Sequence, residues 1–216
     1  VLTIDVLQAL GVREPDLAEC MAEAWSISDE GNALLVIASA RPDMTDVAGI
    51  YGHFIRWGYR NGRLERWLGK LWNLVSTHAV ETPVWRRIAL HYNFWRLGLA
   101  EAPDRLTTAT WLAQGPEPWT ISDPIAYAVT HEVFYVTDFG SYPERFPQNI
   151  TDYVALWLPS WMRCFAAESN WDLVSEFLMV AACLREVDGI SSPLLSLLEK
   201  QEADGCYPAP REAGWQ

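Results

Sequence analysis

The stretch that decides the fold runs from residue 127 to residue 140 and reads YAVTHEVFYVTDFG. Almost every position is apolar or aromatic, which is the pattern of a helix that is buried on all sides. Three groups that are costly to bury, His131, Glu132 and Asp138, nevertheless lie within it. Such a helix is stable only if these groups satisfy one another or face a wet cavity, so the segment predicts a helix that walls an internal pocket.

Helical signals recur along the rest of the chain, whereas strand signals are scarce because β-branched residues do not alternate with polar ones. We expect an all-α fold of helices joined by short turns. With 216 residues and 50% hydrophobic content, the chain is most simply one domain, residues 1–216. The predicted helices span residues 15–25, 45–60, 63–78, 83–99, 104–113, 123–140, 149–169, 171–187 and 191–201.

A histidine followed four residues later by an aromatic residue occurs three times, at intervals of 38 and 40 residues. A period near 40 residues is typical of an array of helical hairpins. Coincidence is the alternative in a chain with twelve tryptophans, and both interpretations stay open. The pairs are His53 with Trp57, His91 with Trp95 and His131 with Tyr135, and the turns or helices that follow them open with Arg63-Leu64, Arg105-Leu106 and Arg145-Phe146.

The charge is negative overall and unevenly distributed. A net charge of -12 argues against a nucleic-acid surface, which needs clustered cations. Residues 51–100 are the exception, because they carry two acids and eight bases. This basic band serves either ion pairs between helices or an anion site for sulfate or phosphate. Its members are Arg56, Arg60, Arg63, Arg66, Lys70, Arg86, Arg87 and Arg96.

The cysteines and the apolar runs favour a cytoplasmic protein outside the membrane. Four cysteines show no CxxC pair or regular spacing, which is typical of reduced thiols. The start VLTIDVLQALGV lacks the basic residues of a signal peptide, and the longest apolar runs are about half of a membrane span. His53, His91, His131 and Asp138 have metal-ligand chemistry but not the short spacing of metal sites, so we expect no metal or cofactor.

On a helix, residues 127, 131, 135 and 138 share one face. His131 is therefore our candidate general base or acid, and Asp138 is the group that orients it or balances a cation. Tyr127 and Tyr135 can donate to a developing oxyanion or leaving group. The alternative is that His131 and Asp138 form a satisfied buried pair with no catalytic role.

Aromatic side chains near the histidines favour a pocket for a cationic or amine-bearing small molecule, because indole and phenol faces attract positive charge. The alternative is that most of these rings only fill the core. The candidate substrate-binding residues are Tyr127, Glu132, His91, Trp95, His53, Trp57 and Arg56.

The tail carries Gln201-x-x-Asp204-Gly205-x-Tyr207. It resembles the Gln-x-x-Asp-Gly-aromatic turn of α/α-toroid proteins in the terpene-cyclase and prenyltransferase superfamily. That resemblance implies inner helices around a central, aromatic-lined cavity. The acidic motifs DxDD and DDxxD are absent, and 216 residues are short for six hairpins. A partial toroid, completed by a protein partner in a heteromer, is what the resemblance implies.

The segment THEVFYVTDFG, residues 130–140, resembles an actinobacterial family of biosynthetic gene clusters. This implies an enzyme that acts on a natural-product intermediate, by ring closure or elimination in a desolvated pocket. One such activity is similar to aziridine formation in azinomycin-type pathways, where an amine displaces a sulfate- or phosphate-type leaving group. The competing hypotheses are a non-catalytic helical scaffold subunit that docks another protein and a metal-dependent hydrolase or oxygenase.

Overall fold

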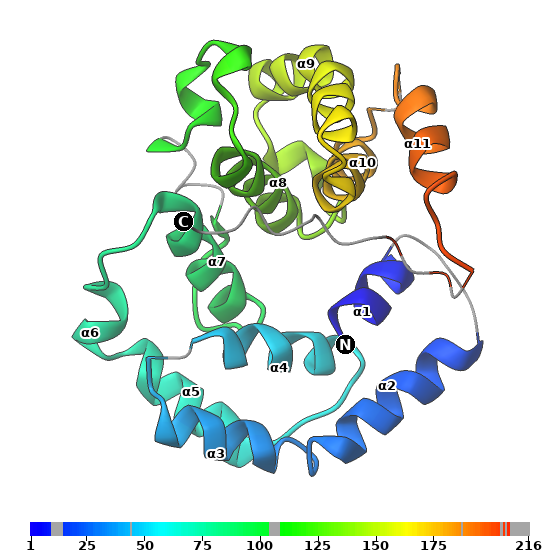
Figure 1. Ribbon diagram of the computed structural model, residues 1–216. Coiled ribbons are helices and arrows are strands. Elements are labelled where there is room, and N and C mark those ends of the chain that lie inside the picture. The colour runs from blue at the N-terminus through cyan, green and yellow to red at the C-terminus, as the bar shows by residue number, and fades with distance from the viewer. Residues whose placement is uncertain are drawn as a thin grey trace, which may run out of the picture. The chain divides into compact units, whose positions relative to one another are not determined.

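The computed structural model describes residues 1–9, 15–43, 45–103, 109–186, 188–203, 205 and 207. Within these ranges every regular element is a helix and no strand occurs, which confirms the all-α class. The chain divides into two compact units, Val1–Thr107 and Thr108–Gln216 (Figure 1). The single domain expected from the sequence stays a prediction. No helix in the described ranges is both long and apolar enough to cross a membrane.

Unit 1 is a bundle of short helices. Helix α3 packs on α5, α4 packs on α7, and α1 contacts both α2 and α4 (Figure 1). Aromatic and leucine side chains of α4, α5 and α7 form its core, including Tyr51, Phe54, Leu64, Leu68 and Phe94. The helices are α1 (Leu2–Ala9), α2 (Pro15–Ile27), α3 (Asn32–Ala40), α4 (Asp46–Arg56), α5 (Gly62–Trp72), α6 (Val75–His78) and α7 (Val84–Trp95).

The start of α5 is fixed by a capping residue that α4 holds. The Asn61 side chain accepts hydrogen bonds from the backbone N–H groups of Arg63 and Leu64, at 3.1 and 3.0 Å. The Tyr51 hydroxyl of α4 accepts from the Asn61 N–H at 2.6 Å and donates to Glu65 at 2.7 Å. Helix α4 therefore decides where α5 begins and which of its faces points outward.

A buried ion cluster joins α1 to α4 and α7. Asp5 is 1% exposed, and its Oδ2 lies 2.6 Å from His53 Nδ1 and 3.1 Å from Arg96 Nη2. Arg56 Nε lies 3.6 Å from the other carboxylate oxygen. Burial raises the pKa of Asp5, but the hydrogen bond with His53 and the charges of Arg56 and Arg96 together bring that pKa below its ordinary value. The carboxylate is thus held ionised where three helices meet.

We predict that Asp5→Asn lowers the free energy of unfolding at pH 7 by about 3 kcal/mol, because it leaves Arg96 and His53 buried without their anion. Since the folded-state pKa of Asp5 is lowered from 3.8, its contribution is present above pH 3.8 and is lost as the pH falls below that value. Urea unfolding followed by circular dichroism at pH 7 and at pH 3 measures both effects.

The matched control is Asp43→Asn, which removes an exposed aspartate–arginine pair with Arg41. We expect that variant to change stability far less, because solvent screens exposed pairs. Equal stability of the two variants would show that the buried cluster does not hold unit 1 together.

Unit 2 is built around α10. Helix α10 packs on α8 and α9, and α11 contacts both α9 and α10 (Figure 1). The rings of Trp161, Phe165 and Phe177 stack where α9 meets α10, with centroids 5.8 Å apart in both pairs that Phe177 makes. The elements are η2 (Leu112–Gln114), η3 (Pro118–Thr120), α8 (Asp123–Thr137), η4 (Pro143–Arg145), α9 (Gln148–Ala167), α10 (Trp171–Leu184) and α11 (Ser191–Leu198).

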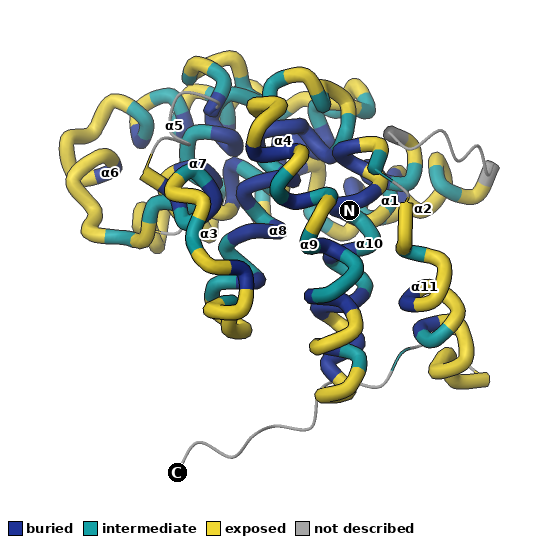
Figure 2. The backbone as a smooth tube through the Cα atoms, turned by 90° about the horizontal axis from the view of Figure 1, so that it is seen from above, coloured by how far each residue is buried: buried dark blue, intermediate teal, exposed yellow. Residues whose placement is uncertain are grey.

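Helix α8 confirms the buried helix that the segment 127–140 predicts, and it is coloured mainly as buried or intermediate in Figure 2. The helix ends at Thr137, however, because Asp138 and Phe139 adopt left-handed conformations with φ of 48° and 52°. Asp138 therefore lies in the turn after α8 and not on its helical stripe. At Gly140, with φ of 82°, an added Cβ would lie 3.1 Å from the Cα of Cys183 in α10, so only glycine fits.

Other predicted boundaries differ for local reasons. The helix expected at 63–78 is broken between α5 and α6, where the Asn73 side chain donates to the Gly69 carbonyl at 2.7 Å. Helices α1 and α3 were not predicted. Half of the helix expected at 104–113 and the repeat opener Arg105-Leu106 lie outside the described residues, as does Asp204 of the tail motif.

Candidate functional site

A pocket of about 480 Å³ opens in unit 1 between the turn before α4, the α6 region and α7. Its volume lies in the range of small-molecule sites. We call it the histidine pocket. Its polar lining includes His78, His91, Arg86, Arg87, Asp43 and Asp46, and its apolar lining includes Leu74, Val80 and Leu90.

The two histidines of the pocket are held by one tryptophan. The Trp72 ring lies edge-on to His78 and to His91, with centroid distances of 4.5 and 5.2 Å. His78 Nε2 lies 2.6 Å from the Trp72 carbonyl oxygen, which can only accept. Nε2 of His78 therefore carries the hydrogen, and its Nδ1 is left as an acceptor in the neutral ring.

His91 is half-buried and poised as a base. Burial lowers its pKa from 6.5, and the charges of His78 and Arg87 lower it further. Among the residues that the structure describes, neither ring nitrogen of His91 has a hydrogen-bond partner. His91 is thus neutral at neutral pH and able to accept a proton from a molecule in the pocket.

Helix α7 also gives the pocket a cationic wall. Arg86 and Arg87 are exposed, and neither forms an ion pair with any described residue. The Arg86 guanidinium lies over the Trp85 ring at 4.4 Å. Asp43, which also lines the pocket, is already paired with Arg41 at 2.6 Å. Two guanidinium groups therefore remain available to an anionic ligand.

The other residues that the sequence proposed in unit 1 lie apart from this lining. His53 and Arg56 are brought together at Asp5. Trp57 follows the last residue of α4, and Trp95 is the last residue of α7. Because His53 bonds a carboxylate while His91 faces a pocket, the repeated histidines of unit 1 occupy different environments.

In unit 2, polar side chains of α8 and α10 meet along a line that we call the α8–α10 seam. The Tyr127 hydroxyl donates to Asp172 at 2.6 Å, and the Thr130 hydroxyl donates to Glu176. His131 Nδ1 lies 2.7 Å from the Tyr127 carbonyl oxygen and 3.7 Å from Glu176 Oε2. The predicted groups Tyr127 and His131 thus meet carboxylates that belong to α10.

Burial raises the pKa of two acids in unit 2, Glu132 and Glu176. It raises the pKa of Glu132 to about 8, although the Thr110 hydroxyl donates to Glu132 at 2.9 Å and opposes the shift. It raises the pKa of Glu176 to about 7, opposed by the hydrogen bond from Thr130 and reinforced by Asp172. A raised pKa near 7 lets Glu176, which lies 3.7 Å from His131, exchange a proton near neutral pH.

Tyr127, His131 and Tyr135 share one face of α8 as predicted, with ring centroids 6.4 Å apart for Tyr127–His131 and 5.8 Å apart for His131–Tyr135. Asp138 is 3% exposed in the turn that follows α8. Its role in orienting His131 stays a prediction. A single cavity that joins these residues to His91 and Trp95 also stays a prediction.

Sequence reasoning missed His78, Asp172 and Glu176. A signal for the two acids was present, since they lie four residues apart in the otherwise apolar helix WDLVSEFLMVAACL. His78 had no such signal, because only the fold brings the end of α6, where His78 lies, close to α7. In the described ranges, no group of three or more His, Cys, Asp or Glu side chains is placed to hold a metal ion.

The family described as a domain of unknown function, DUF6895, matches residues 7–216. The chain belongs to this family. No curated protein and no solved structure matches it. The DUF6895 match spans both units, and so it includes both the histidine pocket and the α8–α10 seam.

We predict that the stability of the DUF6895 chain falls as the pH rises from about 4.5 to about 8, because Glu132 keeps its proton in the folded state and loses it in the unfolded state. Glu132→Gln removes this titration, so the variant should lose less stability over that range and exceed the wild type at pH 8. Thermal unfolding across this pH range measures the slope.

Glu168→Gln is the control, because Glu168 lies exposed at the end of α9. A Glu132→Gln slope equal to that of the control would mean that Glu132 is ionised in the folded chain.

Proposed function

We propose that this DUF6895 protein is a small-molecule enzyme that binds a sulfate- or phosphate-type group at Arg86 and Arg87 and uses His91 as a general base. The observation that supports this most strongly is a half-buried neutral histidine in the same pocket as two arginines that make no ion pair with any described residue. Arginine offers a planar fork that matches the oxygens of such groups. The pocket volume also suits a small molecule.

The chemistry that these groups support is ring closure or elimination. In ring closure, a substrate amine gives a proton to a ring nitrogen of His91 and forms a bond to a carbon atom. The carbon–oxygen bond of that carbon breaks, and the sulfate or phosphate leaves with the electron pair. In elimination, His91 takes the proton from a neighbouring carbon instead, and a double bond forms. In both cases the arginines stabilise the departing anion.

The lining also supports a substrate that carries an amine. Asp46, in the first turn of α4, lines the pocket and makes no ion pair with any described residue. Nδ1 of His78 can accept a hydrogen bond from an ammonium or amine group when the only ring hydrogen is on Nε2. A zwitterion would thus find a cationic wall on α7 and an acidic group at the start of α4.

Further parts of this proposal rest on the sequence resemblances. They are a partial α/α toroid around an aromatic cavity, a partner chain that completes it and a natural-product substrate. The proposed cytoplasmic location rests on the cysteine pattern and the apolar runs instead. The tail lends the toroid limited support, because Gln201 Nε2 donates to the Gly205 carbonyl at 3.0 Å and closes the turn that carries the motif.

A second candidate for proton transfer is the α8–α10 seam. His131 lies 3.7 Å from Glu176, whose pKa is raised to about 7, and a pair of this kind can exchange a proton near neutral pH. His131, Tyr135 and Asp138 therefore stay candidate catalytic residues. Separate substitutions in the pocket and in the seam distinguish the two sites.

We predict that inorganic sulfate binds the histidine pocket. In NMR titrations the His91 ring should show a midpoint below pH 6.5 without sulfate, and that midpoint should rise when sulfate is added, because the anion favours the imidazolium form. Arg86→Ala with Arg87→Ala should abolish the rise and weaken sulfate binding about tenfold or more.

His131→Ala and Arg163→Ala, both in unit 2, are the controls and should leave the His91 midpoint and its response to sulfate unchanged. A His91 midpoint that does not move with sulfate would remove the basis of the anion site. Loss of the response in His131→Ala would favour the seam instead.

A further inference from the structure

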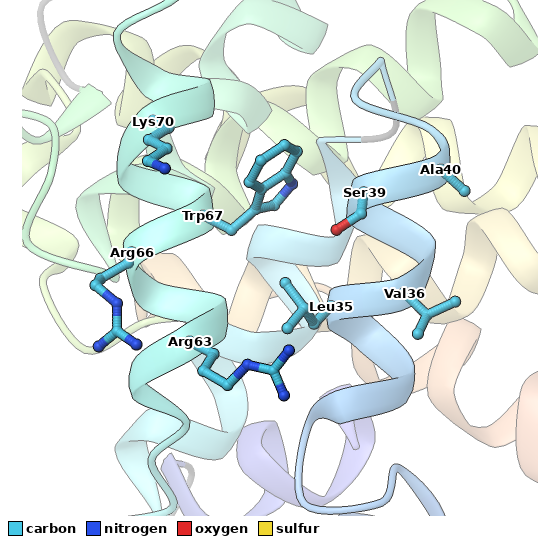
Figure 3. A pocket seen from close by; sticks show the side chains of 8 residues that line it. All are labelled: Leu35, Val36, Ser39, Ala40, Arg63, Arg66, Trp67 and Lys70. Atoms are coloured by element: carbon cyan, nitrogen blue, oxygen red, sulfur yellow. The ribbon is translucent and has the colours of Figure 1, made fainter.

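A second hollow of unit 1 lies between α3 and α5, and its lining residues differ from those of the histidine pocket. It is a groove of about 660 Å³ that we call the α3–α5 groove (Figure 3). Arg63, Arg66 and Lys70 line its α5 side. They follow the spacing i, i+3, i+7, so they form one stripe about 10 Å long on a helix.

Within the described part of the chain, the three cations have no anionic partner. Among the described residues, none of them makes an ion pair or a side-chain hydrogen bond, and the groove lining contains no acid. Beside them lie Val36, which is 67% exposed, and Trp67, whose Nε1 donates to the Ala38 carbonyl at 3.1 Å. The groove thus combines unpaired positive charge with an apolar floor whose indole is fixed in place.

Helix α2 presents the complementary pattern. Asp16, Glu19 and Glu23 are exposed, follow the same spacing i, i+3, i+7, and make no ion pair with any described residue. Exposed Ala18 and Ala22 lie beside them and allow close approach of another helix. In Figure 1, α2 extends away from the turn before α3, whereas α5 packs beside α3, and among the described residues no ion pair joins the acidic stripe of α2 to the cations of the groove.

We propose that the α3–α5 groove binds helix α2 of a second copy of this chain. In a parallel arrangement, Asp16 aligns with Arg63, Glu19 with Arg66 and Glu23 with Lys70, because the residue spacings of the two stripes are identical. The alanines of α2 then face Val36 and Trp67. A chain with a net charge of -12 repels its copies, so association needs such a local match of opposite charges.

The contact joins two different surfaces, so each chain offers one groove and one acidic helix. Two chains that exchange them reciprocally form a closed two-fold dimer. Because exposed ion pairs carry the contact, salt should weaken it. This inference is independent of the enzyme proposal, since the groove and the histidine pocket share no lining residue.

The test is sedimentation of the full chain at low and high salt, with two charge-reversal variants. One variant carries Arg63→Glu and Arg66→Glu, and the other carries Glu19→Lys and Glu23→Lys. We expect the wild type to self-associate at low salt, and each variant alone to associate about tenfold more weakly. An equimolar mixture of the two variants should regain association, because each then offers a surface complementary to the other.

The control carries Arg163→Glu and Lys200→Glu, two exposed cations of unit 2 that change the net charge by the same amount as the groove variant. It should associate as the wild type does. A wild type that stays monomeric at about 100 μM and low salt would overturn the inference. The inference would also be overturned if the mixture of variants failed to associate while the wild type did. A chain that stays monomeric but binds an unrelated acidic helical peptide would overturn it as well.

Discussion

Unit 1 depends on the interactions of one buried carboxylate, that of Asp5. It accepts from Arg96, the residue that caps α7, and it pairs with His53 of α4. Because Arg96 follows the helix that carries His91 and Arg87, the position of α7 against α4 is set at its end by charge and along its length by packing. Asp5 therefore helps to fix the geometry of the histidine pocket, although it does not line that pocket.

The two units bury acids in opposite ways. Unit 1 surrounds Asp5 with cations, so the carboxylate stays ionised. In unit 2 the hydroxyl of Thr110 donates to Glu132 and no described cation lies against it, so burial keeps the proton on the acid. The first solution holds helices in place, whereas the second leaves a proton that can be exchanged near neutral pH. This difference explains why Glu132 and Glu176, rather than Asp5, resemble groups used for proton transfer.

The sequence predicted the parts that depend on one helix at a time. The buried character of α8 and the shared face of Tyr127, His131 and Tyr135 follow from apolar content and helical spacing. The partners of His131 could not be predicted, because Glu176 lies on another helix and only packing brings it near. The left-handed conformation of Asp138 could not be predicted, because the apolar pattern of the helix continues past it to Phe139. The sequence thus predicted helices one at a time, but it did not predict which helices pack together.

The contact of Gly140 with the backbone of Cys183 has a mechanical consequence. At most points along α8 and α10, side chains separate the two helices and can change rotamer to absorb a small displacement. At position 140 the backbone of the turn meets the backbone of α10 so closely that an added Cβ would lie 3.1 Å from the Cα of Cys183. Because two backbones meet here without an intervening side chain, we expect a displacement of the turn after α8 to be passed directly to α10.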